Sequence, residues 1–184
     1  ETPFISRLIE LWSCMGEVRS AWRPYWATPA NGLRNTVTIT SDETAITNLL
    51  YRYAEAMDAG DLNGAADLLR HADIILPDGD SPIGADDILD IWNDRVILHH
   101  DGTPRTKHVI TNVIVEIADD RHSATARSYY TVLQQIDNHP LAPIIAGRYH
   151  DVLAKVDDVW RFAQRDYSLV DLVGDLSHHL AMGP

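Results

Sequence analysis

Three polar side chains, far apart in the sequence, have types suited to acid–base chemistry: Tyr53, Asp58 and His108. A histidine with an unperturbed pKa of about 6.5 can remove a proton next to a carbonyl group near neutral pH. A carboxylate can fix the tautomer of such a histidine, and a phenol can donate a hydrogen bond to a developing enolate oxygen. Each residue also has a structural interpretation: a core tyrosine bonded to a backbone carbonyl, a solvated aspartate in a polar turn, and a histidine that only packs on a strand.

The helix that must carry the tyrosine and the aspartate begins with a capping signal, Thr40 as N-cap with Glu43 three residues later, and Gly60 supplies its end. Asp58 falls near its C-terminus, where a carboxylate opposes the helix dipole at a cost of about 0.3–1 kcal/mol. This placement predicts a compensating partner, for example a histidine. Apolar residues at helical spacing predict one buried face: Ile46, Leu49, Leu50, Tyr53 and Met57.

The rest of the chain reads as two further helices followed by strands. The second helix runs from Asp61 as N-cap to about Arg70, and the third spans about residues 85–98, with Ile88, Leu89, Ile91 and Trp92 as its apolar residues. From Thr106 the hydrophobic period changes to two, which is typical of strands. The predicted strands are residues 74–76, 107–117, 123–135, 144–156 and 159–169, with turns at Asp119-Asp120 and Asp157-Asp158.

Consecutive strands joined by short turns indicate an antiparallel meander, and helices gathered before strands indicate an α+β fold. The helices must then cover one face of a single curved sheet. Because side chains alternate along a strand, His108 is expected to share a face with Ile110 and Asn112.

Five local patterns in this order resemble the SnoaL-like branch of the NTF2-like superfamily. They are LYRYAEAMDAGD at 50–61, TKHVITN at 106–112, ATARSY at 124–129, GRYHD at 147–151 and WRFAQR at 160–165. That branch includes scytalone dehydratase, bile-acid 7α-dehydratase, polyketide cyclases and the β subunits of ring-hydroxylating dioxygenases. The resemblance implies an NTF2-like cone, in which a curved mixed or antiparallel sheet wraps around N-terminal helices. The matching stretches span about residues 40–169. We expect residues 37–184 to form one SnoaL-like domain and residues 1–36 to be an arm or leader of unknown role.

For individual residues, the resemblance implies that His108 occupies the position of the family's catalytic histidine and that Tyr53 matches a tyrosine of its dehydratases. Arg165 matches a pocket arginine, while Asn112 and Arg127 are further candidates for binding polar groups of a ligand. For Arg127 a surface salt bridge is the alternative. Scytalone dehydratase also uses a second sheet histidine, and the nearest candidate here, His150, lies in a different pattern.

The expected function is therefore that of a cofactor-free lyase or isomerase acting on a small hydrophobic ligand that bears a carbonyl group, such as a steroid, polyketide or aromatic fragment. Two alternatives stay open: a binding protein that leaves its ligand unchanged, and a structural partner like a dioxygenase β subunit. The resemblance also implies a homodimer or higher homo-oligomer that forms through the exposed face of the sheet.

Composition narrows the partners and the chemistry. A formal net charge of −12 without a compensating basic cluster argues against nucleic acid and membrane surfaces. The single cysteine, Cys14, cannot form an internal disulfide, so the cytoplasm is the default location. The sequence lacks HExxH, CxxC, GxSxG, Walker and GxGxxG patterns, and the adjacent pairs His99-His100 and His178-His179 diverge on a helix. We therefore expect neither a metal site nor a bound cofactor.

Overall fold

A computed structural model describes residues 40–77, 79 and 81–181 of this chain. The predicted arm at residues 1–36 lies outside the described residues. No helix in the described part of the chain is long and apolar enough to cross a membrane.

The first described helix, α2 (Asp42–Ala59), carries the predicted buried face, since Ile46, Leu49, Leu50, Tyr53 and Met57 are all buried. Its end at Gly60 is also confirmed, with φ 74° in the left-handed region. The predicted N-cap at Thr40 is wrong by one residue. The hydroxyl of Ser41 accepts the N–H of Thr44 at 3.2 Å, which satisfies a free donor of the first turn and starts the helix at Asp42.

Two shorter helices follow: α3 (Leu62–Leu68) and α4 (Ala85–Arg95). The side chain of Asp61 caps α3 as predicted, by accepting the N–H of Gly64 at 2.9 Å. Helix α4 ends three residues before the predicted Leu98, because Val96 turns extended and forms an antiparallel bridge with Leu180. Trp92 is buried as expected, whereas Ile91 is exposed.

The six strands are β1 (Asp73–Ile75), β2 (Thr106–Ile117), β3 (Ser123–Gln134), β4 (Ala142–Val156), β5 (Val159–Asp166) and β6 (Val170–Val173). They form one mixed sheet in the order β1-β5-β4-β3-β2, with β6 paired to β4. Strands β2 to β5 make the predicted antiparallel meander, and β1 runs parallel to β5. Strand β2 is therefore an edge of the sheet.

The strand predicted over residues 159–169 ends three residues early, at Asp166, and β6, which follows it, was not predicted. After β5, the carboxylate of Asp166 accepts the N–H of Ser168 at 2.8 Å, a local bond that favours a turn. The chain then continues as β6, which pairs with β4 around Ile145 and Ala146 rather than around His150. The two strands thus line successive parts of one edge of β4.

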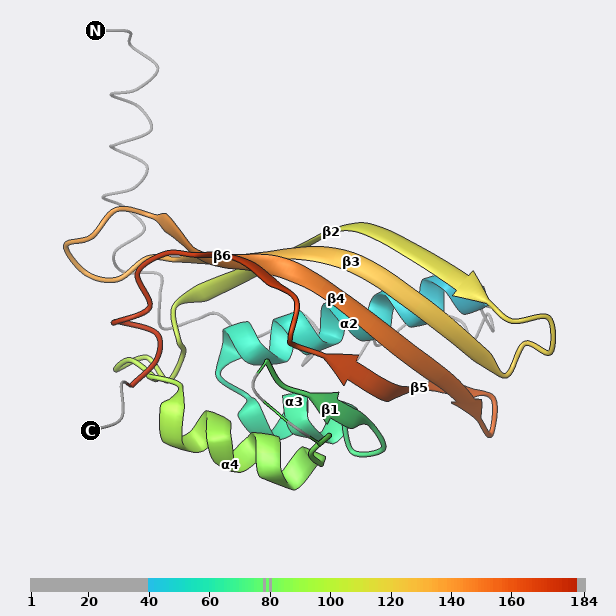
Figure 1. Ribbon diagram of the computed structural model, residues 1–184. Coiled ribbons are helices and arrows are strands. Elements are labelled where there is room, and N and C mark those ends of the chain that lie inside the picture. The colour runs from blue at the N-terminus through green and yellow to red at the C-terminus, as the bar shows by residue number, and fades with distance from the viewer. Residues whose placement is uncertain (1–39, 78, 80, 182–184) are drawn as a thin grey trace, which may run out of the picture. The chain divides into compact units, whose positions relative to one another are not determined.

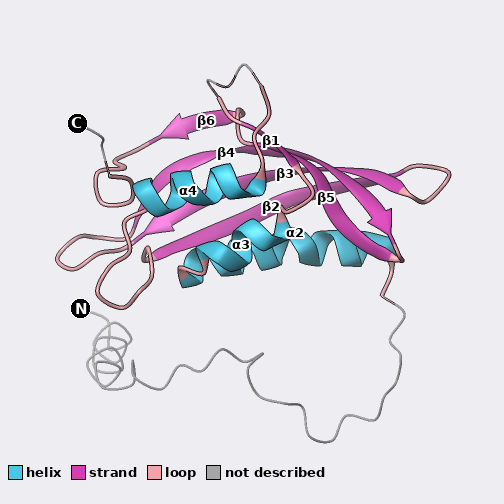
Figure 2. Cartoon of the chain, turned by 90° about the horizontal axis from the view of Figure 1, so that it is seen from below, coloured by secondary structure: helices cyan, strands magenta, loops and turns pink. Residues whose placement is uncertain are grey.

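Helices α2, α3 and α4 lie on one face of the curved sheet, as Figures 1 and 2 show from two directions. The inner face of β3 illustrates the packing, because every second residue from Ala124 to Gln134 is buried. Most of the core lies between this face and α2, α3 and α4. A second cluster on the inner face contains Tyr130, Val132, Ile144 and Tyr149. The architecture is the predicted α+β cone.

Candidate functional site

Asp58 and His108 are in direct contact where the last turn of α2 meets the start of β2. His108 Nδ1 lies 2.7 Å from Asp58 Oδ1, and the His108 backbone N–H donates to Asp58 Oδ2 at 2.9 Å. The hydroxyl of Thr106 also donates to Oδ1, at 2.9 Å. Because β2 is an edge strand, this backbone N–H has no neighbouring strand on that side, and the carboxylate satisfies it. The partner expected for Asp58 is thus His108.

This contact fixes the chemistry of the imidazole. An ionised carboxylate can only accept hydrogen bonds, so Nδ1 of His108 carries a proton, and in the neutral ring the lone pair is on Nε2. The side chain of His108 is only 7% exposed and lies on the inner side of the sheet with Ile110. A buried imidazole oriented in this way can act as a general base through Nε2.

A groove of about 390 Å³ runs between α2 and the β2 edge, and Asp58 and His108 belong to its lining. Its apolar walls are formed by Tyr51, Val109 and Ile110, of which Tyr51 and Val109 are more than 40% exposed. Two charged side chains, Glu55 and Lys107, also line the groove. This groove is large enough to hold part of a small organic molecule beside the Asp58–His108 pair.

Tyr53 lies in a different set of contacts. It is five residues before Asp58 on α2, about 7.5 Å along the helix axis. Its hydroxyl accepts a hydrogen bond from the hydroxyl of Tyr167 at 2.8 Å, and burial raises its pKa well above the usual value. This bond leaves the Tyr53 proton available for another acceptor. Tyr53 also fits the structural interpretation of a buried core tyrosine, except that its hydroxyl bonds to Tyr167 and not to a backbone carbonyl.

Arg165 is fully buried among aromatic rings. Its guanidinium carbon lies 3.6 Å from the ring centroid of Tyr149 and 4.3 Å from that of Tyr53. Its Nη1 lies 3.4 Å from Asp151 Oδ2, and burial raises the pKa of Asp151 to about 6 against the opposing charge of Arg165. Arg165 Nε, Asp151 Oδ1 and Ser128 Oγ are buried without a hydrogen-bond partner in the part of the chain that the structure describes. Such atoms in one region indicate room for a bound water or a polar group of a ligand.

The other two predicted binding residues lie elsewhere. Asn112 has a positive φ of 54°, in a β-bulge where the pairing of β2 with β3 shifts between Thr111 and Ile114. The bulge interrupts the alternation of side chains, so Asn112 is exposed. The prediction that Asn112 shares a face with His108 is therefore wrong. Arg127 is exposed on the outer face of β3, where its Nη2 lies 3.6 Å from Glu116 Oε2. This contact corresponds to the surface salt bridge that the sequence analysis gave as the alternative role of Arg127. His150 is likewise exposed on β4.

Sequence reasoning missed His179, which comes from the C-terminal segment. It is 8% exposed, and its Nδ1 is buried without a hydrogen-bond partner among the residues described here. Burial lowers its pKa from 6.5 to about 4. Its backbone oxygen accepts the N–H of Ile97 at 2.9 Å, which ties its segment to the chain just after α4. The pair His178-His179 was considered only as a metal site. No periodicity marks a residue that reaches the site from an irregular segment.

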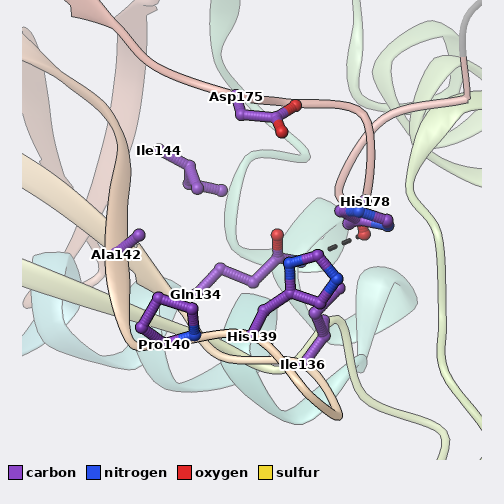
Figure 3. Close-up of a pocket in the computed structure, with 8 residues that line it drawn as sticks. All are labelled: Gln134, Ile136, His139, Pro140, Ala142, Ile144, Asp175 and His178. Carbon is purple, nitrogen blue, oxygen red and sulfur yellow. Dashed lines mark hydrogen bonds between the residues drawn. The ribbon is translucent and has the colours of Figure 1, made fainter.

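A small cavity of about 150 Å³ lies beside this segment, between the β3–β4 loop and residues 175–178. Figure 3 shows Gln134 reaching from the end of β3 to the backbone oxygen of His178, at 3.1 Å. The same amide donates to the backbone oxygen of Pro104 at 2.9 Å, just before β2. The rings of His139 and His178 stand 5.0 Å apart. Gln134 therefore ties the C-terminal segment to the start of the strand that carries His108.

Within residues 40–77, 79 and 81–181, no group of three or more His, Cys, Asp or Glu side chains has an arrangement that could hold a metal ion.

The chain has clear relatives. A family model described as a SnoaL-like domain matches residues 38–166. Among solved structures, Rv3472 from Mycobacterium tuberculosis, a protein of unknown function, is 25% identical, with 69% of this chain and 70% of that chain covered and a TM-score of 0.54. No curated protein matches the chain in sequence.

Two structures from Novosphingobium aromaticivorans share the fold at lower identity. A candidate scytalone dehydratase is 20% identical, with 71% of this chain and 85% of that chain covered and a TM-score of 0.55. An NTF2-like protein with a cystatin-like fold is 16% identical, with 68% and 79% covered and a TM-score of 0.53. These similarities show that the fold is shared. The reaction must be inferred from the residues of the site.

Proposed function

This chain belongs to the SnoaL-like domain family, and from that premise we propose that it is a cofactor-free lyase or isomerase acting on a hydrophobic, carbonyl-bearing small molecule. The observation that carries the proposal is the bond between Asp58 and His108 Nδ1, which leaves Nε2 as a base on the inner side of the sheet. A similar fold in a candidate scytalone dehydratase supports the reaction class.

In this mechanism His108 Nε2 removes a proton from the carbon next to the carbonyl, and the electron pair of the C–H bond moves into an enolate. Asp58 stabilises the imidazolium that forms, because its carboxylate already accepts the Nδ1 proton at 2.7 Å. The hydroxyl of Tyr53 donates a hydrogen bond to the enolate oxygen, since the bond from Tyr167 leaves the Tyr53 proton unused. The enolate then either expels a hydroxyl group from the neighbouring carbon or takes the proton back at another carbon. In the first course the hydroxyl group takes the proton from His108 Nε2 and leaves as water, with formation of a double bond. The second course gives a shifted double bond.

The surroundings favour an apolar substrate body. The groove beside His108 is lined by the apolar side chains of Tyr51, Val109 and Ile110. Aromatic and aliphatic walls of this kind bind rings and alkyl chains, while one or two polar groups orient the ligand. The steroid, polyketide and aromatic classes named from the sequence share these properties.

The test is hydrogen–deuterium exchange at the carbon next to the carbonyl, because this step precedes both outcomes and does not require the natural substrate. The protein in D₂O is mixed with a panel of steroid, polyketide-like and aromatic ketones, and exchange is followed by NMR. We expect His108→Ala and Asp58→Asn each to slow exchange by roughly 100-fold or more. Tyr53→Phe should slow it by about 100-fold through loss of the oxygen-binding donor.

Matched controls are His150→Ala and Asp90→Asn, which change exposed residues of β4 and α4 and should leave exchange unaltered. Undiminished exchange in one of the three site variants would remove that residue from the mechanism. If the wild-type protein binds ketones but exchanges none of them, the chain is a binding protein and the catalytic proposal is wrong.

A further inference from the structure

The cavity of about 150 Å³ beside the C-terminal segment is separate from the groove at His108, and among the described residues the two share no lining side chain. Its apolar wall is formed by Ile136, Pro140, Ala142 and Ile144. An apolar cavity of about 150 Å³ can hold a molecule of the size of benzene. This cavity therefore has room for one aromatic ring or a short alkyl chain, and not for a fused ring system such as a steroid.

The buried side chain of Gln134 presents an acceptor to this cavity. Gln134 is only 5% exposed, and its amide nitrogen donates to the backbone oxygens of Pro104 and His178. An amide nitrogen has two donors, so these two bonds use both of them and fix the orientation of the group. The amide oxygen consequently faces the part of the cavity where Ile144 and Asp175 lie, as Figure 3 shows. It is placed there to accept a hydrogen bond from a ligand.

The charge at this cavity is negative. Asp175 lines it, and hydrogen bonds from the side chain and the backbone N–H of Ser177 lower the pKa of its carboxyl group, so that it is ionised at neutral pH. In the described part of the chain the lining includes no Lys or Arg side chain. The imidazoles of His139 and His178, with ring centroids 5.0 Å apart, complete the polar part of the wall, and a neutral imidazole offers one acceptor nitrogen.

An ammonium group matches this set of acceptors. It brings a positive charge and several N–H donors, which suit the carboxylate of Asp175 and the amide oxygen of Gln134. An anionic ligand would instead meet the charge of Asp175 with no cationic side chain to offset it. A metal ion is a poor match as well, since no group of three or more His, Cys, Asp or Glu within the described ranges has an arrangement that could hold one. The net charge of −12 adds a general attraction for cations.

We propose that this cavity binds a primary ammonium compound whose apolar body has the size of one aromatic ring. The ammonium group pairs with Asp175 and donates to the amide oxygen of Gln134, while the ring packs against Ala142 and Ile144. Binding here requires no turnover at His108, so this site is independent of the proposed lyase or isomerase function.

The experiment is an NMR titration of the protein with benzylamine at pH 8, where the amine is protonated and an ordinary imidazole is neutral. Benzyl alcohol and benzoate are matched ligands of similar size with no charge and with a negative charge. We expect benzylamine to bind at least about 10-fold more tightly than benzyl alcohol, because hydrogen bonds to a charged partner are the stronger ones, and benzoate to bind more weakly than both. The shifted backbone signals should be those around Ala142 and Asp175.

Two variants separate the charge from the cavity. Asp175→Asn should weaken benzylamine binding by about 10-fold and leave benzyl alcohol within about 3-fold of wild type. Ala142→Leu fills the apolar wall and should weaken both ligands together by about 10-fold or more. Asp90→Asn, which removes an exposed charge on α4, is the matched control and should change neither ligand. Circular dichroism checks that each variant is folded.

Equal affinity of the wild-type protein for the three ligands would overturn the inference. So would benzylamine binding that is unchanged in Asp175→Asn or in Ala142→Leu, or signal changes that lie away from this cavity. Exchange of ketone protons at His108 is a separate measurement on other residues. Failure of the ammonium site therefore leaves the proposed function standing, and failure of the proposed function leaves the ammonium site standing.

Discussion

At the scale of single residues, the Asp58 carboxylate is placed against its own helix dipole and held there by three donors. The hydroxyl of Thr106 and the backbone and ring nitrogens of His108 all point to it. Charge-assisted hydrogen bonds are about twice as strong as neutral ones, and three of them exceed the cost of the unfavourable helix position. The same bonds that stabilise the carboxylate also set the tautomer of His108. Structure and proposed chemistry therefore depend on one set of contacts.

The buried neutral state of His179 makes the stability of the protein depend on pH. In the unfolded chain its pKa is 6.5, and in the folded chain burial lowers it to about 4. The contribution of His179 is therefore complete above pH 6.5 and is lost as the pH falls towards 4, where the unfolded state alone has bound a proton. The difference between these pKa values corresponds to about 3 kcal/mol.

The measurement is urea unfolding of wild type and His179→Asn at pH 7 and pH 4.5. Because asparagine does not titrate, the variant should lose less stability over this interval than wild type, by about 2–3 kcal/mol. The comparison removes the contributions of other groups, such as Asp151, whose raised pKa acts with the opposite sign. Parallel losses in the two proteins would show that His179 is not buried in its neutral form.

At the scale of elements, the site depends on how α2 ends. Gly60 adopts φ 74°, and its missing side chain lets the loop at Gly102 approach the helix end. Gly102 has a similar φ of 76°, but a Cβ added there would meet nothing within 4 Å. The two glycines thus share the same backbone requirement and differ in their surroundings.

This difference gives a paired prediction. Gly102→Ala should cost only the backbone strain of a left-handed residue, about 1–2 kcal/mol in the free energy of unfolding. Gly60→Ala should cost clearly more, at least about 3 kcal/mol, because the added methyl group also forces the loop and helix apart. Chemical unfolding of both variants measures the difference. Equal losses would mean that the helix–loop contact contributes nothing.

At the scale of the whole molecule, the outer face of the sheet carries exposed apolar side chains. Val109 and Ile114 on β2, Tyr129 on β3 and Leu172 on β6 are each more than 40% exposed. A cluster of this kind on one face is typical of an interaction surface. The homodimer that the family resemblance implies stays a prediction, in which this face would meet a second copy of the chain.

A charge placed in that surface tests the dimer. We expect the wild-type protein to be a dimer and the Tyr129→Lys variant to be a monomer, because a dimer of the variant would bury two ammonium groups without partners. Ile91→Lys is the control, since Ile91 is similarly exposed but lies on α4, among the helices. Light scattering after size-exclusion chromatography measures both. A monomeric wild type, or a dimer that persists in Tyr129→Lys, would contradict this interface.

The sequence by itself determined the order of the elements, because the hydrophobic period is a local property of the chain. It predicted the buried face of α2, the antiparallel meander and the family, and it singled out Asp58 and His108. It also anticipated that a carboxylate at a helix C-terminus needs a partner, since the helix dipole acts on the residue wherever the helix packs.

Only the tertiary structure decided which side chains meet. The bulge at Asn112, the early end of α4 at Val96 and the formation of β6 along β4 each arise from pairing between distant segments. The same applies to His179, which reaches the site through bonds from Ile97 and Gln134 to its segment and follows no periodic pattern. Contacts between residues far apart in the chain depend on packing of the whole fold, and this information is absent from local spacing.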